Sequence, residues 1–178
     1  MIIKNRVAID PGSSGGIVWG SNMRDVQAIN MPKTTGDLWD LIKNLSEGHE
    51  AVCLMEKVGT YMPGNSGPSA ATFAEHVGEL RMALIASGMP HELVPPQSWQ
   101  KAFVGAPGYV KIEQTLDESK EGFLKRKRGI LTTRKTERKN KIKAQAQMIF
   151  PDITVTLANA DALGIYWFGM QNVALWRD

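Results

Sequence analysis

The strongest constraint on the fold is a continuous apolar run of strand length, Ala51-Val52-Cys53-Leu54-Met55. A strand with one solvent-facing side alternates apolar and polar residues, whereas this run has no polar position. We therefore expect it to form a central strand that is covered by other elements on both faces. The run ends at Glu56, so an acidic side chain should lie where this strand leaves the sheet.

Three shorter strands are expected before this run, at residues 7–9, 16–19 and 26–29. Short connections rich in Gly, Ser and Asn separate them, which favours antiparallel hairpins. Helical spacing of apolar residues and stop signals predict the remaining elements. They are a helix at 37–45, a helix from Ser69 as N-cap to a stop at Gly88, a strand at 92–94, a helix around 142–149, an edge-strand candidate at 153–155 and a final helix at 159–171.

The order of these elements predicts the fold class. The strands at 51–55 and 92–94 are each reached through a helix, so they should lie parallel to the first strand. The prediction is an α/β fold with a mixed five-stranded sheet, three antiparallel strands followed by two parallel ones, flanked by helices.

Composition indicates one domain over residues 1–178. The chain is 43% hydrophobic and 22% charged, and its length is that of a single compact unit. No stretch approaches the roughly 18 consecutive apolar residues of a membrane span, and the N-terminus lacks the apolar core of a signal peptide. Its single cysteine, Cys53, excludes a disulfide framework and a cysteine-cluster zinc site. We expect a cytoplasmic protein with no membrane association.

Positive charge is concentrated in one segment. Residues 120–143 hold eleven of the 21 basic residues and only two of the 18 acidic ones, so the rest of the chain is net acidic although the whole carries +3. Such a segment favours a polyanionic partner, most simply nucleic acid, over a solvated charged helix or loop. The predicted DNA-binding residues in it are Lys125, Arg126, Lys127, Arg128, Arg134, Lys135, Arg138, Lys139 and Lys141.

Three carboxylates occupy places from which they can meet. Asp10 ends the first strand, Glu56 ends the apolar run, and Asp161 opens the last helix. Each alone is more simply a turn former, a surface charge or a helix-terminal charge. Clustered carboxylates repel one another unless protons or cations intervene, and oxygen ligands suit Mg²⁺ or Mn²⁺. Two such ions, about 3.5–4 Å apart, support phosphodiester cleavage.

Several short motifs, in order, resemble those of one known family. They are Ile9-Asp10-Pro11-Gly12-Ser13 followed by Gly16, Met55-Glu56-Lys57-Val58, Ser69-Ala70-Ala71 with Gly78 and Arg81, Val104-Gly105, Lys143-Ala144-Gln145-Ala146-Gln147-Met148, and Asp161-Ala162-Leu163. The set resembles the RuvC family of Holliday-junction resolvases, within the ribonuclease H-like superfamily, over most of the chain.

The resemblance implies roles for particular residues. Asp10, Glu56 and Asp161 would be metal ligands for two Mg²⁺ or Mn²⁺ ions, and Lys143 would act at the scissile phosphate. Lys101 is a second basic candidate, with its register displaced by about one residue. Tyr61 or Met62 would be a wedge that stacks on an unpaired base at the junction centre, or else a packed loop anchor.

Two departures from the family pattern stand out. The family commonly has another Asp or His three residues before its last Asp, where this chain has Ala158. The connection between the Val-Gly and Lys-Ala-Gln blocks is expanded to about 106–142, a basic insertion that we expect to hold DNA arms, with ordering on contact as an added hypothesis.

The resulting prediction is a divalent-metal-dependent endonuclease that cleaves branched DNA, most simply four-way Holliday junctions, as a homodimer in the cytoplasm of a bacterial or phage-infected cell, near the nucleoid. One alternative is a branched-DNA-binding module with a degenerate acidic site. Another is an ATPase fragment of the actin and sugar-kinase type, because residues 10–16 could cradle phosphate, although one 178-residue copy lacks the second domain that encloses a nucleotide.

Overall fold

The computed structural model of the chain describes residues 4–48, 50–59 and 67–176. Its centre is a mixed five-stranded sheet with the order β3-β2-β1-β4-β5. Strands β1, β2 and β3 form antiparallel hairpins, while β4 lies parallel to β1 and β5 lies parallel to β4. The strands are β1 (Lys4–Asp10), β2 (Gly16–Gly20), β3 (Val26–Asn30), β4 (Glu50–Glu56) and β5 (His91–Val94). The predicted fold class is confirmed.

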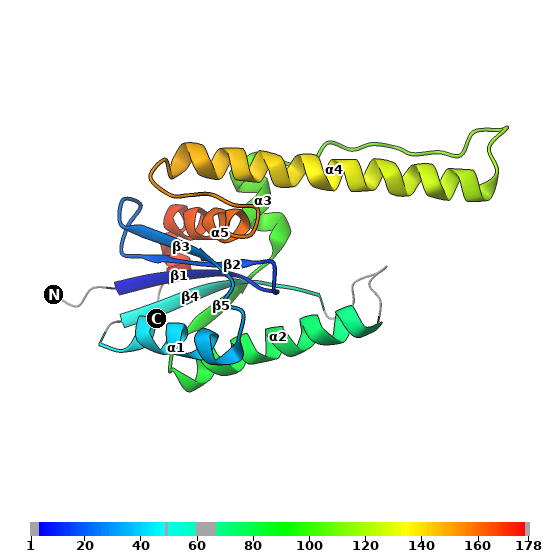
Figure 1. Cartoon of the computed structure of the whole chain (residues 1–178). Helices are drawn as coiled ribbons and strands as arrows, with labels where there is room; N and C mark the ends of the chain where they lie inside the picture. Colours follow the sequence, from blue (N-terminus) through cyan, green and yellow to red (C-terminus); the bar gives the residue numbers. More distant parts are fainter. Residues whose placement is uncertain (1–3, 49, 60–66, 177–178) are drawn as a thin grey trace.

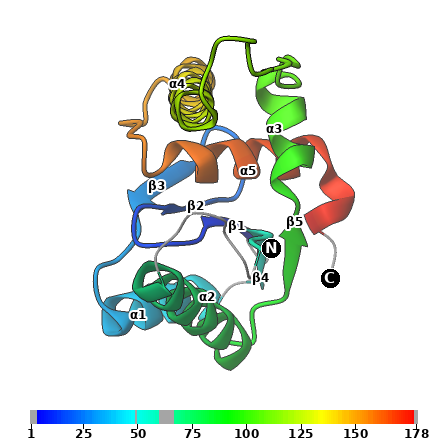
Figure 2. The same cartoon turned by 90° about the vertical axis from the view of Figure 1, so that its right-hand side faces the viewer.

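Helices cover both faces of this sheet (Figure 1). On one face lie α1 (Thr35–Ser46) and α2 (Gly67–Ala86). On the other face lie α3 (Pro96–Val104), α4 (Lys120–Ile149) and α5 (Ala160–Gln171), followed by the short helix η1 (Val173–Trp176). Figure 2 looks nearly along α4 and shows the two helical layers with the sheet between them. No helix in the described ranges is both long and apolar enough to cross a membrane.

The alternation of side chains along the central strands divides the core in two. Val7 and Ile9 of β1 join the core beneath α1 and α2. Ala8 of β1 and Leu54 of β4 join the other core, beneath α3, α4 and α5. Because β4 is buried on both faces, its sequence is apolar at every inner position, as predicted. Cys53 is buried there.

Two local predictions about the helices differ from the structure. Helix α2 begins at Gly67, so Ser69 lies in its first turn and is not the N-cap. Helix α3 is not predicted from the sequence, where Pro95-Pro96 indicates only the end of a strand. Pro95 is instead the N-cap and Pro96 the first helical residue. A backbone N–H at this position would have no partner within the helix, so proline is tolerated there.

The edge strand expected at 153–155 does not form, because this described segment pairs with no strand of the sheet. The side chain of Gln147 supplies hydrogen bonds that a neighbouring strand would otherwise make. Its Nε2 donates to the Ile153 carbonyl at 3.1 Å, and its Oε1 accepts from the Val155 backbone N–H at 3.4 Å. The segment therefore follows α4 as a connection that stays outside the sheet.

Helix α4 is much longer than the helix predicted around 142–149. It starts after Ser119, whose side chain caps it by accepting from the Gly122 backbone N–H at 3.1 Å. Ile142 and Ala146 are buried against the body, and the N-terminal half extends beyond the sheet (Figure 1). The basic segment is thus a helical arm, and residues 105–119 run alongside it from α3 at the body to the tip, where α4 begins.

Candidate active site at the sheet edge

The register of the two central strands places Asp10 beside Glu56. Ile9 pairs with Met55 in the parallel ladder, so the next residue on each strand is acidic. Asp10 shares the side-chain parity of Ala8, and Glu56 shares that of Leu54, both of which face the layer of α3, α4 and α5. The two carboxylates therefore end neighbouring strands on the same face of the sheet.

Gly16 allows the start of α5 to approach this edge. It pairs with Asp10 across the β1–β2 hairpin. A Cβ atom on Gly16 would lie 2.9 Å from the Ala158 carbonyl oxygen and 2.9 Å from the Asn159 Cα. Because Gly16 has no side chain, the chain before α5 lies directly against β2, and Asp161 in the first turn of α5 is near enough for its charge to act on Asp10.

Asn159 fixes the turn that leads into α5. Its side chain is 2% exposed, its Oδ1 accepts from the Thr156 backbone N–H at 2.8 Å, and its Nδ2 donates to the Thr154 carbonyl at 3.1 Å. The amide is therefore used inside the turn. It cannot also replace the acid that is missing at Ala158.

Asp10, Glu56 and Asp161, here called the acidic cluster, act on one another electrostatically. Burial raises the pKa of Asp10 well above its ordinary value of 3.8, and the charges of Asp161 and Glu56 raise it further. Burial, with a contribution from Asp161, raises the pKa of Glu56 from 4.5 to about 7. Burial also raises the pKa of Asp161. Negative charge at this edge is thus costly until a cation compensates it.

Trp99 of α3 contacts the cluster directly. Its Nε1 donates a hydrogen bond to Glu56 Oε1 at 2.9 Å, and this bond lowers the pKa of Glu56 against the effect of burial. Trp99 is fully buried, and its ring packs closely against Gly164 of α5. Nothing in its spacing from Glu56 along the chain indicated the hydrogen bond.

Lys139 is the cation whose charge lowers the pKa of all three carboxylates, and Arg138 adds to this effect at Asp161. Lys143, the residue selected by the resemblance, is half-buried one turn further along α4. Lys101 is exposed on α3. The roles of Lys143 and Lys101 remain predictions. Lys139, predicted only as a general DNA-binding residue, is the lysine whose charge acts on all three acids.

The other predicted DNA-binding residues fall into two groups. Arg126, Arg134 and Arg138 make hydrogen bonds within the protein. The remaining basic residues of α4 that were assigned to DNA are exposed to solvent, namely Lys125, Lys127, Arg128, Lys135, Lys139 and Lys141. Tyr61 and Met62, the predicted wedge residues, lie outside the described residues.

The donor chemistry of the cluster fits a hard divalent cation. All three side chains offer carboxylate oxygens, and their pKa values are raised first by burial and, for Asp10 and Glu56, also by the charge of neighbouring acids. Within residues 4–48, 50–59 and 67–176, no three acidic, histidine or cysteine side chains are already drawn together as metal ligands are. The three acids thus share one electrostatic environment without converging on a single point.

A groove of about 800 Å³ lies on the α2 side of the sheet, whereas Asp10 and Glu56 face the layer of α3, α4 and α5. It lies between the turn after Asp10 and the first turns of α2, and Lys33 and His76 are among its lining residues. His76 Nδ1 accepts from the Gly12 backbone N–H at 3.3 Å, which ties this turn to α2. Gly12 has a φ of 109°, a conformation that favours glycine.

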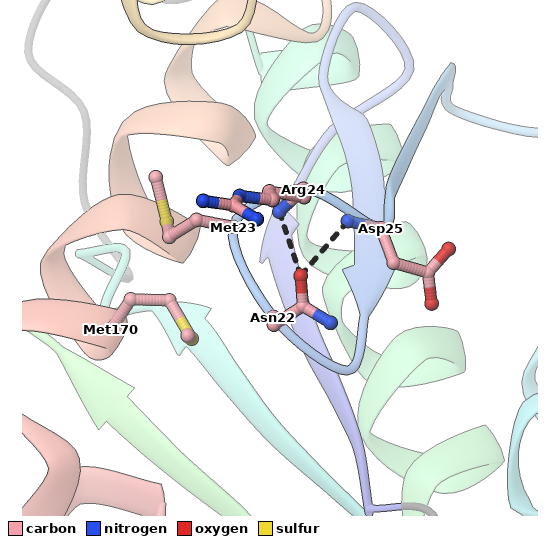
Figure 3. Close-up of a pocket in the computed structure, with 5 residues that line it drawn as sticks. All are labelled: Asn22, Met23, Arg24, Asp25 and Met170. Atoms are coloured by element: carbon pink, nitrogen blue, oxygen red, sulfur yellow. Dashed lines mark hydrogen bonds between the residues drawn. The ribbon is translucent and has the colours of Figure 1, made fainter.

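A second hollow lies far from the acids. The β2–β3 turn, with Asn22 to Asp25, and Met170 of α5 line it (Figure 3). Asn22 Oδ1 accepts from the backbone N–H groups of Arg24 and Asp25 and so stabilises the turn. Since Gly20 pairs with Arg6 near the beginning of β1, this hollow is at the opposite end of the sheet from Asp10.

Comparison with solved structures decides the fold. A structure of Thermus thermophilus RuvC matches with a TM-score of 0.50 and 14% identity, over 95% of this chain and 96% of that one. The T. thermophilus RuvC structure in complex with Holliday junction substrate matches with a TM-score of 0.55 and 13% identity, over 97% and 95%. The chain has a RuvC-like fold.

The likeness in fold extends over nearly the whole chain. The sequence itself matches no protein-family model and no curated protein. At 13–14% identity the likeness concerns the fold. The chemistry must be argued from the residues of this chain.

Proposed function

We propose that this protein is a divalent-metal-dependent endonuclease that cuts branched DNA, most simply a four-way junction. The observation that carries the proposal is the mutual electrostatic influence of Asp10, Glu56 and Asp161 at one edge of a RuvC-like sheet. A similar structure is that of T. thermophilus RuvC with a Holliday junction substrate, which supports the choice of DNA as the substrate class.

Asp10, Glu56 and Asp161 would hold Mg²⁺ or Mn²⁺, most simply as a pair of ions. When bound, such ions lower the pKa of an attacking water and stabilise the leaving oxygen of a phosphodiester. Trp99 orients Glu56 through its indole N–H. Lys139 brings positive charge to the place where charge develops on the phosphate.

A homodimer completes the proposal. A four-way junction presents two equivalent strands, and two sites related by a two-fold axis would cut them symmetrically. The acidic cluster of one chain provides one site, so a second copy is needed for paired incisions.

The first experiment uses a synthetic immobile four-way junction and a linear duplex with the same arm sequences. We expect Mg²⁺ to support paired nicks in the junction, with little cutting of the duplex and none in EDTA. Equal cutting of both DNAs would contradict branch selectivity, and junction cutting in EDTA would contradict metal dependence.

A non-cleaving branched-DNA-binding module is the second candidate. Two observations favour it: Ala158 occupies the place of a further acid, and the described residues show no preformed group of three metal ligands. Binding of the junction without any nick in Mg²⁺ or Mn²⁺ would support the module over the nuclease.

A further inference from the structure

The basic residues of the arm formed by α4 fall into two groups, those that bond within the protein and those that are exposed along one side of the helix. With 30 residues, α4 is about 45 Å long at 1.5 Å per residue. Only its C-terminal part is buried against the body, and the rest extends past the sheet edge at which β1 and β4 end (Figure 1). A helix that carries so much like charge in solvent needs both an internal support and a neutralising partner.

Three arginines provide the internal support by fastening the extended segment 105–119 and helix α3 to the arm. Arg126 forms an ion pair with Glu118 at 2.7 Å and donates to the Glu113 carbonyl at 2.9 Å. Arg134 donates to the Gly108 carbonyl. Arg138 donates to Gln100 Oε1 at 2.8 Å and to the Gly105 carbonyl at 3.4 Å. These guanidinium groups are therefore already engaged within the protein.

A second set of basic residues forms one line along α4, here called the basic stripe. Its spacing of three or four residues keeps it on one side of the helix, since successive residues are about 100° apart. Its members are Lys125, Arg128, Lys135, Lys139 and Lys143, with Thr132 between Arg128 and Lys135. Within the described part of the chain, none of the five forms an ion pair with an acid.

The stripe leads to the acidic cluster. Lys125, Arg128 and Lys135 are exposed on the projecting part of the arm. Lys139 follows one turn after Lys135, and its charge acts on Asp10, Glu56 and Asp161. A polyanion bound along the stripe would thus pass from the arm directly to the carboxylates.

We infer that the basic stripe binds the phosphate backbone of a duplex arm of the substrate as that arm leaves the active site. The inference rests on the proposed function for the identity of the substrate. From Lys125 to Lys139 the helix rises about 21 Å, the axial length of roughly six phosphates on one strand. Backbone contacts of this kind position DNA without reading its sequence.

Two double variants test the inference, because α4 carries a matched pair of exposed lysines away from the stripe. Lys127 and Lys141 lie roughly 120° or more around the helix from the middle of the stripe. We compare K125Q/K135Q with K127Q/K141Q, which remove the same charge from the same helix and leave Lys139 and Lys143 intact. Circular dichroism and thermal unfolding check that both variants fold.

Binding is measured by fluorescence anisotropy on a junction with arms of about 25 base pairs, in Ca²⁺ over a range of salt concentrations. We expect K125Q/K135Q to lose about tenfold or more in affinity and about two units of the log–log salt slope, at about 0.9 per lost phosphate contact. K127Q/K141Q should stay within about threefold of the wild type. Equal losses in the two variants would overturn the inference.

A junction with the same arms, in which neutral methylphosphonate linkages replace the arm phosphates beyond the central base pairs, separates this inference from the proposed function. Its arms offer the stripe no charge, so K125Q/K135Q should bind it as the wild type does. A selective loss on this neutral-arm junction would contradict a contact with the arm phosphates. Failure of the wild type to nick either junction would instead contradict the nuclease and leave the binding comparison valid.

Discussion

The indole Nε1 of Trp99 donates a hydrogen bond to Glu56 Oε1 at 2.9 Å, which links a fully buried core residue to the acidic cluster. The bond connects α3 to the end of β4 and leaves the second carboxylate oxygen of Glu56 free of this contact. It favours the ionised form of Glu56 in surroundings that otherwise disfavour it. Trp99 therefore contributes both to the packing of the core and to the electrostatics of the acidic cluster.

Removing this hydrogen bond should change the pH dependence of the reaction. In Trp99→Phe, Glu56 would lose a donor that lowers its pKa, so a larger fraction would stay protonated at neutral pH. We expect junction cleavage to fall about tenfold at about pH 7 and to recover partly by about pH 9, measured as a pH–rate profile under single-turnover conditions. Phe103→Leu, a change in the same core without a bond to Glu56, is the control. Parallel profiles for wild type and Trp99→Phe would contradict this role.

The cluster should make the metal-free protein less stable as the pH rises. Glu56 keeps its proton up to about pH 7 in the folded chain, whereas its ordinary pKa is 4.5. The folded state therefore binds more protons than the unfolded state between these values, and its stability falls as the pH increases through that interval. The pKa of Asp10 is also raised in the folded chain, so Asp10 contributes in the same direction.

Asp10→Asn should consequently stabilise the metal-free fold at about pH 8. We expect a gain of about 1–2 kcal/mol, allowing for the partial exposure of the site, or about 3–6 °C in Tm. The measurement is thermal unfolding in EDTA, with the exposed Asp40→Asn on the opposite helical layer as control. Mg²⁺ should raise the Tm of wild type and have less effect on Asp10→Asn. A lower Tm for Asp10→Asn in EDTA would contradict electrostatic strain at the cluster.

Gly16 should be essential for the position of Asp161. In Gly16→Ala the new methyl group would lie 2.8–2.9 Å from backbone atoms of β3 and of the turn before α5, so that turn must move. We expect cleavage to fall at least about 100-fold, with a loss of about 1–3 kcal/mol in stability. Gly129→Ala on α4 is the control, because nothing lies within 4 Å of the added methyl group. Wild-type cleavage by Gly16→Ala would show that this close approach does not position the site.

Lys139 should contribute more to cleavage than to binding. Since its charge acts on all three acids, Lys139→Gln should lower the single-turnover rate about 10–100-fold and weaken junction binding only a few-fold. Lys141→Gln, two residues along and exposed, is the matched control. The same rates in Lys143→Gln decide which of the two lysines serves the scissile phosphate. A Lys139→Gln variant that binds weakly but cuts normally would place Lys139 in DNA binding alone.

The topology could be predicted because its signals are local. The apolar run 51–55, the hairpin connections before it and the helices before β4 and β5 together determine a mixed sheet with β1 and β4 parallel. The same reasoning placed Asp10 and Glu56 at strand ends. Their shared face follows from the period-two alternation of side chains once the register is known.

The parts that were missed depend on contacts between distant segments. The hydrogen bond from Trp99 to Glu56 spans 43 positions. The use of Gln147 in place of a strand partner depends on how α4 ends. The pair Pro95-Pro96 is compatible both with the end of a strand and with the start of a helix, so this signal could not distinguish α3 from a loop. The division of the basic residues likewise required the path of segment 105–119.

The most direct test of a shared metal-dependent site compares Asp10→Asn, Glu56→Gln and Asp161→Asn on the four-way junction in Mg²⁺, with binding and nicking measured on the same samples. We expect each variant to bind the junction within a few-fold of wild type and to lose nicking by at least about 1,000-fold. Nicking at the wild-type rate by any one of the three would contradict a site in which all three carboxylates act together.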